Sequence, residues 1–150
     1  MFLQRKLKTH TNISSEMQEL IEGLKGLPSK EDCLLKVYTY LSDKYHGSRV
    51  KTYTRVYELL YTDIDELWKK TGYLHCTNIN YLAKYLLVHS GHFEEADISL
   101  KWTRVWFISP HQYLKIRMND NVYVNIDVWA KIYGVGYGDF AKGIILKSKK

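Results

Sequence analysis

Cysteine and proline are scarce in this chain, and long apolar runs are absent. Only two cysteines occur, Cys33 and Cys76, and two cannot form the dense disulfide framework of a small secreted domain. No run of about 18 or more apolar residues is present, so we expect no membrane span. The first residues lack the apolar segment of a secretion signal. We therefore expect a soluble, cytoplasmic protein with free thiols.

Linkers and repeats are missing as well. The chain has two prolines, no Gly/Ser-rich tract and no internal repeat that would divide its 150 residues into separate units. Apolar residues make up 45% and charged residues 25%, an ordinary balance for one globular core. We predict a single domain over residues 1–150, with flexible segments at about 1–12 and 147–150.

The body of the chain also lacks a strong charge of one sign. The net charge is +6, but the first ten and last nine residues hold seven lysines and arginines, which leaves −1 for residues 11 to 141. Domains that bind nucleic acid usually carry a basic patch on a folded face, whereas basic tails are commonly solvated. Nucleic acid is therefore not an expected partner, and the sequence does not indicate an oligomeric state.

Helical signals dominate the first half of the chain. Apolar residues at helical spacing, or capping residues, predict helices over about 15–24, from Ser29 to before Gly47, over 63–72 and from Cys76 to Gly91. Residues 50–61 have no clear pattern.

Period-two patterns dominate the second half. Strands are predicted over 98–108, 111–118, 122–129 and 142–147, with residues 119–121 joining the second to the third. Helices followed by antiparallel strands predict an α+β domain, in which N-terminal helices pack on a C-terminal antiparallel sheet.

Cys76 is the residue most suited to covalent chemistry. A thiolate is favoured at a helix N-terminus, next to an imidazolium and where solvent has partial access. Cys76 begins a predicted helix and has polar neighbours, which fits an exposed helix start better than a core. A small buried apolar residue is the alternative interpretation. That interpretation is favoured for Cys33, which lies beside an apolar helical stripe.

A base and an orienting acid follow on the predicted strands. If the loop has three residues, Tyr113 faces Asp127 across the hairpin, and His111 and Asp127 are diagonal neighbours on one sheet face. A two-residue loop would place them on opposite faces, because pairing parity changes with register. The face that carries Asp127 mixes polar and aromatic side chains, as the wall of a site or a solvated surface would.

These three residues resemble the core of the transglutaminase-like superfamily. The resemblance lies in the stretches 72–76 (GYLHC), 110–116 (PHQYLKI) and 124–129 (VNIDVW), with 35 residues from the cysteine to the histidine and 16 more to the aspartate. It covers roughly residues 35 to 130. It implies a papain-like α+β fold in which Cys76 is the nucleophile, His111 the general base and then acid, and Asp127 the group that orients His111.

The resemblance further implies attack on a peptide or protein amide through a thioester acyl-enzyme, without a cofactor. The acceptor is water in a protease or amidase and an amine in a transferase. Tyr73 and His75 are candidates for a side-chain oxyanion donor, and Tyr113 and Trp129 for substrate binding. Three positions depart from the family pattern, which commonly has Gly shortly before the cysteine, a bulky aromatic after it and Trp two residues after the histidine. Here these places hold His75, Thr77 and Tyr113.

Two rival interpretations remain open. His75, Cys76, His89, His92 and His111 could on paper supply zinc ligands, but no C-x-x-C or H-E-x-x-H spacing occurs, so we expect no metal.

The second rival is a catalytically inactive transglutaminase-like fold that binds a peptide or glycan. Thirteen tyrosines and four tryptophans would suit such a groove.

Overall fold

The computed structural model describes residues 6–10, 12–60, 63–106 and 108–143. These residues form a mixed helix and sheet structure. The α-helices are α1 (Ser15–Lys25), α2 (Lys30–Lys44), α3 (Arg49–Thr54), α4 (Ile64–Lys69) and α5 (Cys76–His89). The strands are β1 (Tyr45–His46), β2 (Gly72–Tyr73), β3 (Ile98–Val105), β4 (Ser109–Asn119) and β5 (Val122–Ile126), and the 3₁₀ turns are η1 (Val56–Leu60), η2 (Glu95–Asp97) and η3 (Lys131–Tyr133).

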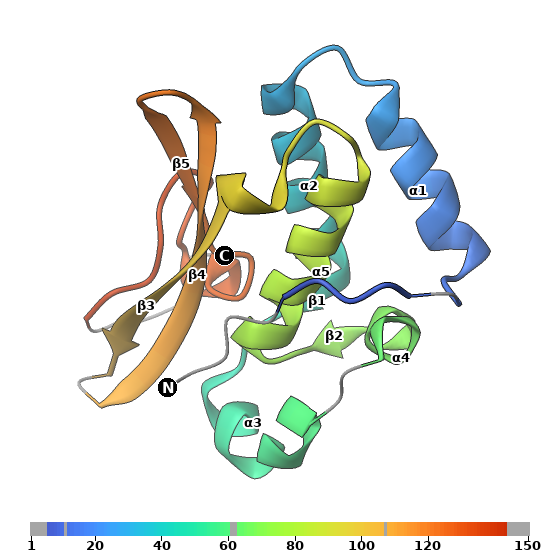
Figure 1. Cartoon of the computed structure of the whole chain (residues 1–150). Coiled ribbons are helices and arrows are strands. Elements are labelled where there is room, and N and C mark those ends of the chain that lie inside the picture. The colour runs from blue at the N-terminus through green and yellow to red at the C-terminus, as the bar shows by residue number, and fades with distance from the viewer. Residues whose placement is uncertain (1–5, 11, 61–62, 107, 144–150) are drawn as a thin grey trace.

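The molecule is arranged in layers around α5. Strands β3, β4 and β5 form an antiparallel sheet in that order, and α5 packs against β4 on one side and α2 on the other. Figure 1 shows α1 beyond α2 and α5, and α3 below the first turn of α5. The predicted α+β class, with helices on an antiparallel sheet, is confirmed.

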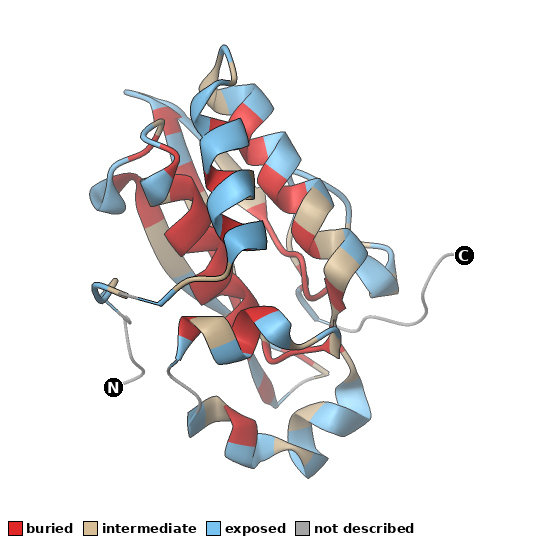
Figure 2. Ribbon diagram, turned by 90° about the vertical axis from the view of Figure 1, so that its right-hand side faces the viewer, coloured by how far each residue is buried: buried red, intermediate tan, exposed pale blue. Residues whose placement is uncertain are grey.

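Helix α5 is the centre of the core. All ten residues from Asn78 to Leu87 are buried, and Figure 2 shows the burial continuing into the sheet behind it. A helix buried on all sides is held by its neighbours rather than by one apolar stripe, so its first residue has a fixed position. Gly91 follows the helix with a φ of 79°, as predicted for a left-handed cap. Within the described ranges, no helix is long and apolar enough to span a bilayer.

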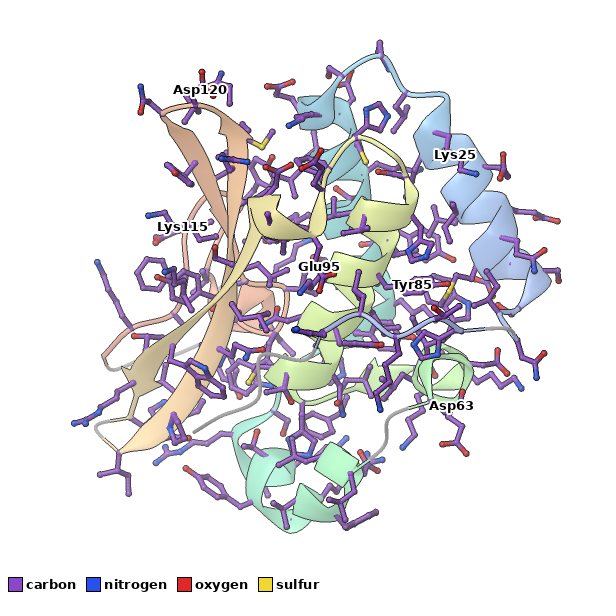
Figure 3. All side chains as sticks on the ribbon, in the orientation of Figure 1. Lys25, Asp63, Tyr85, Glu95, Lys115 and Asp120 are labelled. Carbon is purple, nitrogen blue, oxygen red and sulfur yellow. The ribbon has the colours of Figure 1, made fainter. Side chains whose placement is uncertain are left out.

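The β4–β5 hairpin has the predicted register but not the predicted loop. Leu114 pairs with Ile126 and Arg117 with Tyr123, which is the pairing that places Tyr113 opposite residue 127. At the tip, however, Asn119 pairs with Val122, so the loop has two residues, and Figure 3 shows Asp120 at this turn. A register shift between residues 117 and 119 compensates, because one extra residue in a strand restores the parity that the shorter loop would reverse.

Several predicted strands were too long. Strand β3 ends at Val105, before Trp106 with its φ of 48°, and β5 ends at Ile126, so Asp127 lies just beyond the strand. Residues 144–147 of the predicted last strand lie outside the described residues, while Gly143 forms one isolated bridge with Val105. The short parallel pair β1–β2 was not predicted at all.

The chain termini are described only in part. Of the segments predicted to be flexible, residues 1–5, 11 and 147–150 lie outside the described residues. Residues 6–10 run across α5 (Figure 1). The His10 ring bonds the Tyr81 hydroxyl of this helix at 2.8 Å, and the Leu7 N–H donates to Glu95 of η2 at 3.1 Å.

Candidate active site

His111 and Asp127 form a buried, hydrogen-bonded pair. The Nε2 atom of His111 lies 2.7 Å from Oδ2 of Asp127, and the two residues are 2% and 1% exposed. Strand β4 supplies the histidine, and the aspartate comes directly after β5, so the hairpin register brings the two side chains together.

The backbone fixes the Asp127 carboxylate independently of His111. The Ala130 N–H donates to Oδ1 at 3.2 Å, and the Ala141 N–H donates to Oδ2 at 2.9 Å. These donors come from the turn after β5 and from the C-terminal segment. Because hydrogen bonds to a charged group are stronger than neutral ones, they hold the carboxylate in a position from which it can orient the histidine ring.

Cys76 is the other group that shifts the pKa of the His111 ring. Burial lowers the pKa of His111, but hydrogen bonds with Asp127 and Cys76 and the negative charge of both partners outweigh it and raise the pKa to about 10. Since Nε2 faces Asp127, Nδ1 is the nitrogen left for the sulfur. The imidazolium form is therefore favoured at neutral pH, and a positive ring beside a sulfur stabilises the thiolate.

Aromatic rings close the site around His111. The Trp129 ring lies with its centroid 4.9 Å from that of His111, and Trp129 is 3% exposed. Gly47 packs directly on Trp129: a Cβ at Gly47 would lie 2.3 Å from ring carbons, closer than any real contact. The Gly47 N–H also donates to the Trp129 carbonyl at 3.0 Å. A residue without a side chain is therefore required at position 47 to let the tryptophan cover the histidine.

Cys76 occupies the first position of α5. The preceding His75 has extended backbone geometry, and its carbonyl accepts from the N–H groups of Asn78 and Ile79 at 3.0 Å each. The first N–H groups of a helix have no acceptors within the helix and carry partial positive charge. The Cys76 N–H is one of these groups. Such an N–H can stabilise negative charge on the oxygen of a carbonyl group that lies next to the sulfur.

Tyr73 and His75 do not have the arrangement expected of oxyanion donors. The Arg55 carbonyl can only accept, so Nε2 of His75 donates to it at 2.7 Å. Burial lowers the pKa of His75, which keeps the ring neutral and lets Nδ1 accept from the Tyr73 hydroxyl at 2.9 Å. Both donors are therefore committed within this chain of hydrogen bonds, and the chain instead holds the residue before Cys76 in place.

Tyr113 shares a sheet face with His111, and its ring stacks on Phe140 with centroids 4.0 Å apart. Burial, followed by the charge of Asp127, raises its pKa. Of the four residues predicted to surround the triad, Trp129 contacts the histidine and His75 lines the adjacent pocket, while Tyr113 and Tyr73 have structural contacts.

A pocket of about 350 Å³ opens beside Cys76. It lies where the start of α5 meets the α3–η1 segment and the ends of β3 and β4. Most of its lining is apolar and comes from these segments, including Tyr53, Val56, Leu59, Leu100 and Trp102. A pocket of a few hundred Å³ with few polar groups is typical of a small-molecule or side-chain binding site.

The segment that forms one wall of this pocket is tied to the neighbours of Cys76. His75 donates to the Arg55 carbonyl, and Nδ2 of Asn78 donates to the Glu58 carbonyl at 3.2 Å. Glu58 is 2% exposed and ion-paired with Arg55 and Lys70. Hydrogen bonds thus fix the pocket wall relative to the residues on either side of Cys76. Sequence patterns missed this wall because residues 50–61 have no periodicity.

The histidines proposed as zinc ligands are used elsewhere. His89 bonds the Tyr85 carbonyl through Nδ1 at 2.9 Å, and His92 bonds the Leu24 carbonyl through Nε2 at 3.0 Å. In the part of the chain that the structure describes, no group of three or more histidine, cysteine or acidic side chains is placed to hold a metal ion.

Cys33 has the properties predicted for an inert thiol. It is fully buried, and its sulfur donates to the Ser90 hydroxyl at 3.4 Å. Burial raises its pKa. The two cysteines thus differ in surroundings: one is enclosed in the core, and the other is partly exposed beside a histidine.

The described residues place a partly exposed thiol near a buried histidine–aspartate pair on an α+β scaffold. No family model, curated protein or solved structure matches the chain.

Proposed function

We propose that the protein is a thiol-dependent amide hydrolase or acyltransferase with a transglutaminase-like core, in which Cys76 is the nucleophile. The observation that carries the proposal is the buried His111–Asp127 pair whose second ring nitrogen is left for the sulfur of Cys76. A nucleophile beside a base that an acidic group holds in orientation is the general signature of an activated nucleophile. Their order along the chain is that of the family which the sequence resembles.

The proposed reaction begins with His111 already protonated. The Cys76 thiolate attacks the carbonyl carbon of the amide, a C–S bond forms, and the carbonyl electron pair moves to oxygen near the N-terminus of α5. The C–N bond then breaks as His111 gives its proton to the leaving amine, which yields the thioester. Water or an amine next attacks the thioester, His111 takes the proton of this nucleophile, and the C–S bond breaks to restore the thiolate.

Asp127 acts through His111 in this scheme. It keeps the ring in the orientation that presents Nδ1 to the sulfur, and its charge stabilises the imidazolium. A protein that only binds has no use for a buried ion pair directed at a thiol. The apolar pocket nevertheless supports binding as a second candidate, in which the fold retains a peptide or glycan without chemistry.

A labelling experiment tests the proposal. Treating the folded protein with substoichiometric iodoacetamide at pH 6.5, followed by peptide mapping, is expected to modify Cys76 at least about tenfold faster than a free cysteine-containing peptide, because the thiolate is the reactive form. Cys33 should remain unmodified. A Cys76→Ala variant provides the control, and it should take up no label. If Cys76 is labelled no faster than the peptide, the result would favour the second candidate, a fold that binds a peptide or glycan without chemistry.

A further inference from the structure

The chemistry of the pocket beside Cys76 indicates which substrates the proposed enzyme would accept, so this inference rests on the proposed function. Tyr53 and Val56 of the α3–η1 wall are 58% and 57% exposed, and Trp102 of β3 is 40% exposed. All three line the pocket. An apolar ligand that binds here removes these apolar side chains from water, and this burial favours binding.

Charge in this pocket is already neutralised. Apart from the proposed Cys76 thiolate, Lys84 is the charged residue among the described lining, and its ammonium group lies 2.9 Å from Glu95. Figure 3 shows Glu95 beside α5, on the side of the sheet. A carboxylate or ammonium group of a ligand would therefore lose its hydration without gaining a free counter-ion.

The volume of the pocket sets the size of the ligand. An apolar cavity of about 150 Å³ accommodates one benzene molecule. The space beside Cys76 is about 350 Å³. It is therefore large enough for an aromatic ring or a branched aliphatic chain together with the carbonyl group to which it is joined.

Gln112 supplies a polar contact at the base of this apolar space. It is 2% exposed, and its backbone and side-chain oxygens both accept from Nδ2 of Asn80, at 2.9 and 3.3 Å. Asn80 lies one turn beyond Cys76 on α5. With Oε1 held in this way, no described group accepts from the Nε2 amide of Gln112. This donor belongs to a residue that lines the pocket opposite Trp102, its register partner in β3.

We propose that the acyl group transferred by Cys76 carries a bulky, uncharged apolar side chain, aromatic or branched aliphatic, which occupies this pocket while Gln112 donates a hydrogen bond to a carbonyl of the same acyl group. Trp102 and the α3–η1 wall determine the side-chain preference. Gln112 contacts the substrate without taking part in proton transfer. Neither residue stands out in the sequence, because Trp102 and Gln112 become neighbours only through strand pairing.

Binding can be measured without chemistry in the Cys76→Ala variant. NMR titration should show N-acetyl-phenylalaninamide and N-acetyl-leucinamide binding roughly tenfold more tightly than N-acetylglycinamide, N-acetyl-aspartamide or N-acetyl-lysinamide. The shifts should fall on Trp102 and Gln112. This arm does not depend on a reactive thiol, so it still tests the pocket if the proposed function fails.

Reactivity is measured with benzyloxycarbonyl amino-acid chloromethyl ketones, from which the Cys76 sulfur displaces chloride to form a thioether. The phenylalanine and leucine reagents are expected to inactivate the wild type roughly ten times faster than the glycine, aspartate or lysine reagents. Trp102→Ala should remove most of this preference, measured as the ratio of the phenylalanine rate to the glycine rate. Gln112→Leu should slow all the ketones and keep the preference.

Tyr123→Ala is the matched control, because it removes an aromatic residue that is 51% exposed on β5, away from the pocket lining. Trp102→Leu serves if Trp102→Ala does not fold. Equal binding of the apolar and charged amides, or a preference that survives in Trp102→Ala, would overturn the inference. Slow iodoacetamide labelling of Cys76 with intact apolar binding would instead remove the proposed chemistry and leave the pocket assignment in place.

Discussion

Replacing His111 by alanine is expected to slow the alkylation of Cys76 by iodoacetamide at pH 6.5 by roughly 10- to 100-fold. An ordinary thiol with a pKa of about 8.5 is only about 1% ionised at this pH. In the wild type, burial disfavours the imidazolium, but bonds to Asp127 and Cys76 raise the pKa of His111 to about 10, so a positive charge faces the sulfur. The gain in alkylation rate stays below the roughly 100-fold that complete ionisation of the thiol would give, because a more stabilised thiolate is a weaker nucleophile.

The rate is measured by intact mass over time, at pH values from 5 to 9. The wild-type rate should exceed the His111→Ala rate most at the lowest pH, and the variant's rate should rise about tenfold per pH unit up to the ordinary thiol range. His89→Ala is the control, since that ring bonds a backbone carbonyl of its own helix. Identical pH profiles for wild type and His111→Ala would mean that the histidine does not activate the thiol.

Asp127→Asn is expected to lower the free energy of unfolding by about 3–5 kcal/mol at pH 6.5, because it leaves a buried imidazolium without its counter-ion. For a chain of this size, that corresponds to a fall in Tm of about 6–20 °C. The carboxylate is 1% exposed and accepts from His111, Ala130 and Ala141, so solvent cannot replace it. Thermal unfolding monitored by circular dichroism measures the change.

The effect of Asp127→Asn should depend on pH with a definite sign. The pKa of His111 is raised in the folded wild type to about 10 from 6.5, so the stability it contributes is fully present below about pH 6.5 and is lost as the pH rises through about 10. The stability difference between wild type and variant should therefore shrink from pH 6.5 toward pH 10. Asp120→Asn, at the hairpin turn in Figure 3, is the matched control and should change Tm little. A difference that grows with pH would contradict the assigned ion pair.

The sequence was informative where local pattern and pairing geometry act together. Alternation along residues 111–129 predicted two paired strands, and the requirement that His111 and Asp127 share a face selected one register. The structure has that register. The loop prediction was wrong, because a register shift near Met118 followed by a two-residue turn gives the same pairing as a three-residue loop, and side-chain periodicity does not distinguish them.

The pocket could not be predicted in the same way. Its wall, residues 50–60, folds as two short helical turns that are held by backbone acceptors for His75 and Asn78. Such contacts are between residues about 20 positions apart and leave no period in the sequence. Strands β1 and β2 have two residues each, too few for any alternation to be recognised. Gly47 was interpreted as a helix stop, whereas its role is to let Trp129 approach.

The most direct test of the proposed chemistry is to trap the acyl-enzyme. Mixing the protein with the p-nitrophenyl ester of N-acetyl-phenylalanine in a stopped-flow instrument should give a burst of p-nitrophenolate equal to the enzyme concentration. Quenching in acid should leave one acyl group on Cys76 by mass spectrometry. Cys76→Ala should give no burst, and His111→Ala should give one at least about 100-fold slower. No burst in the wild type, or acylation that does not need His111, would contradict Cys76 and His111 as a catalytic pair.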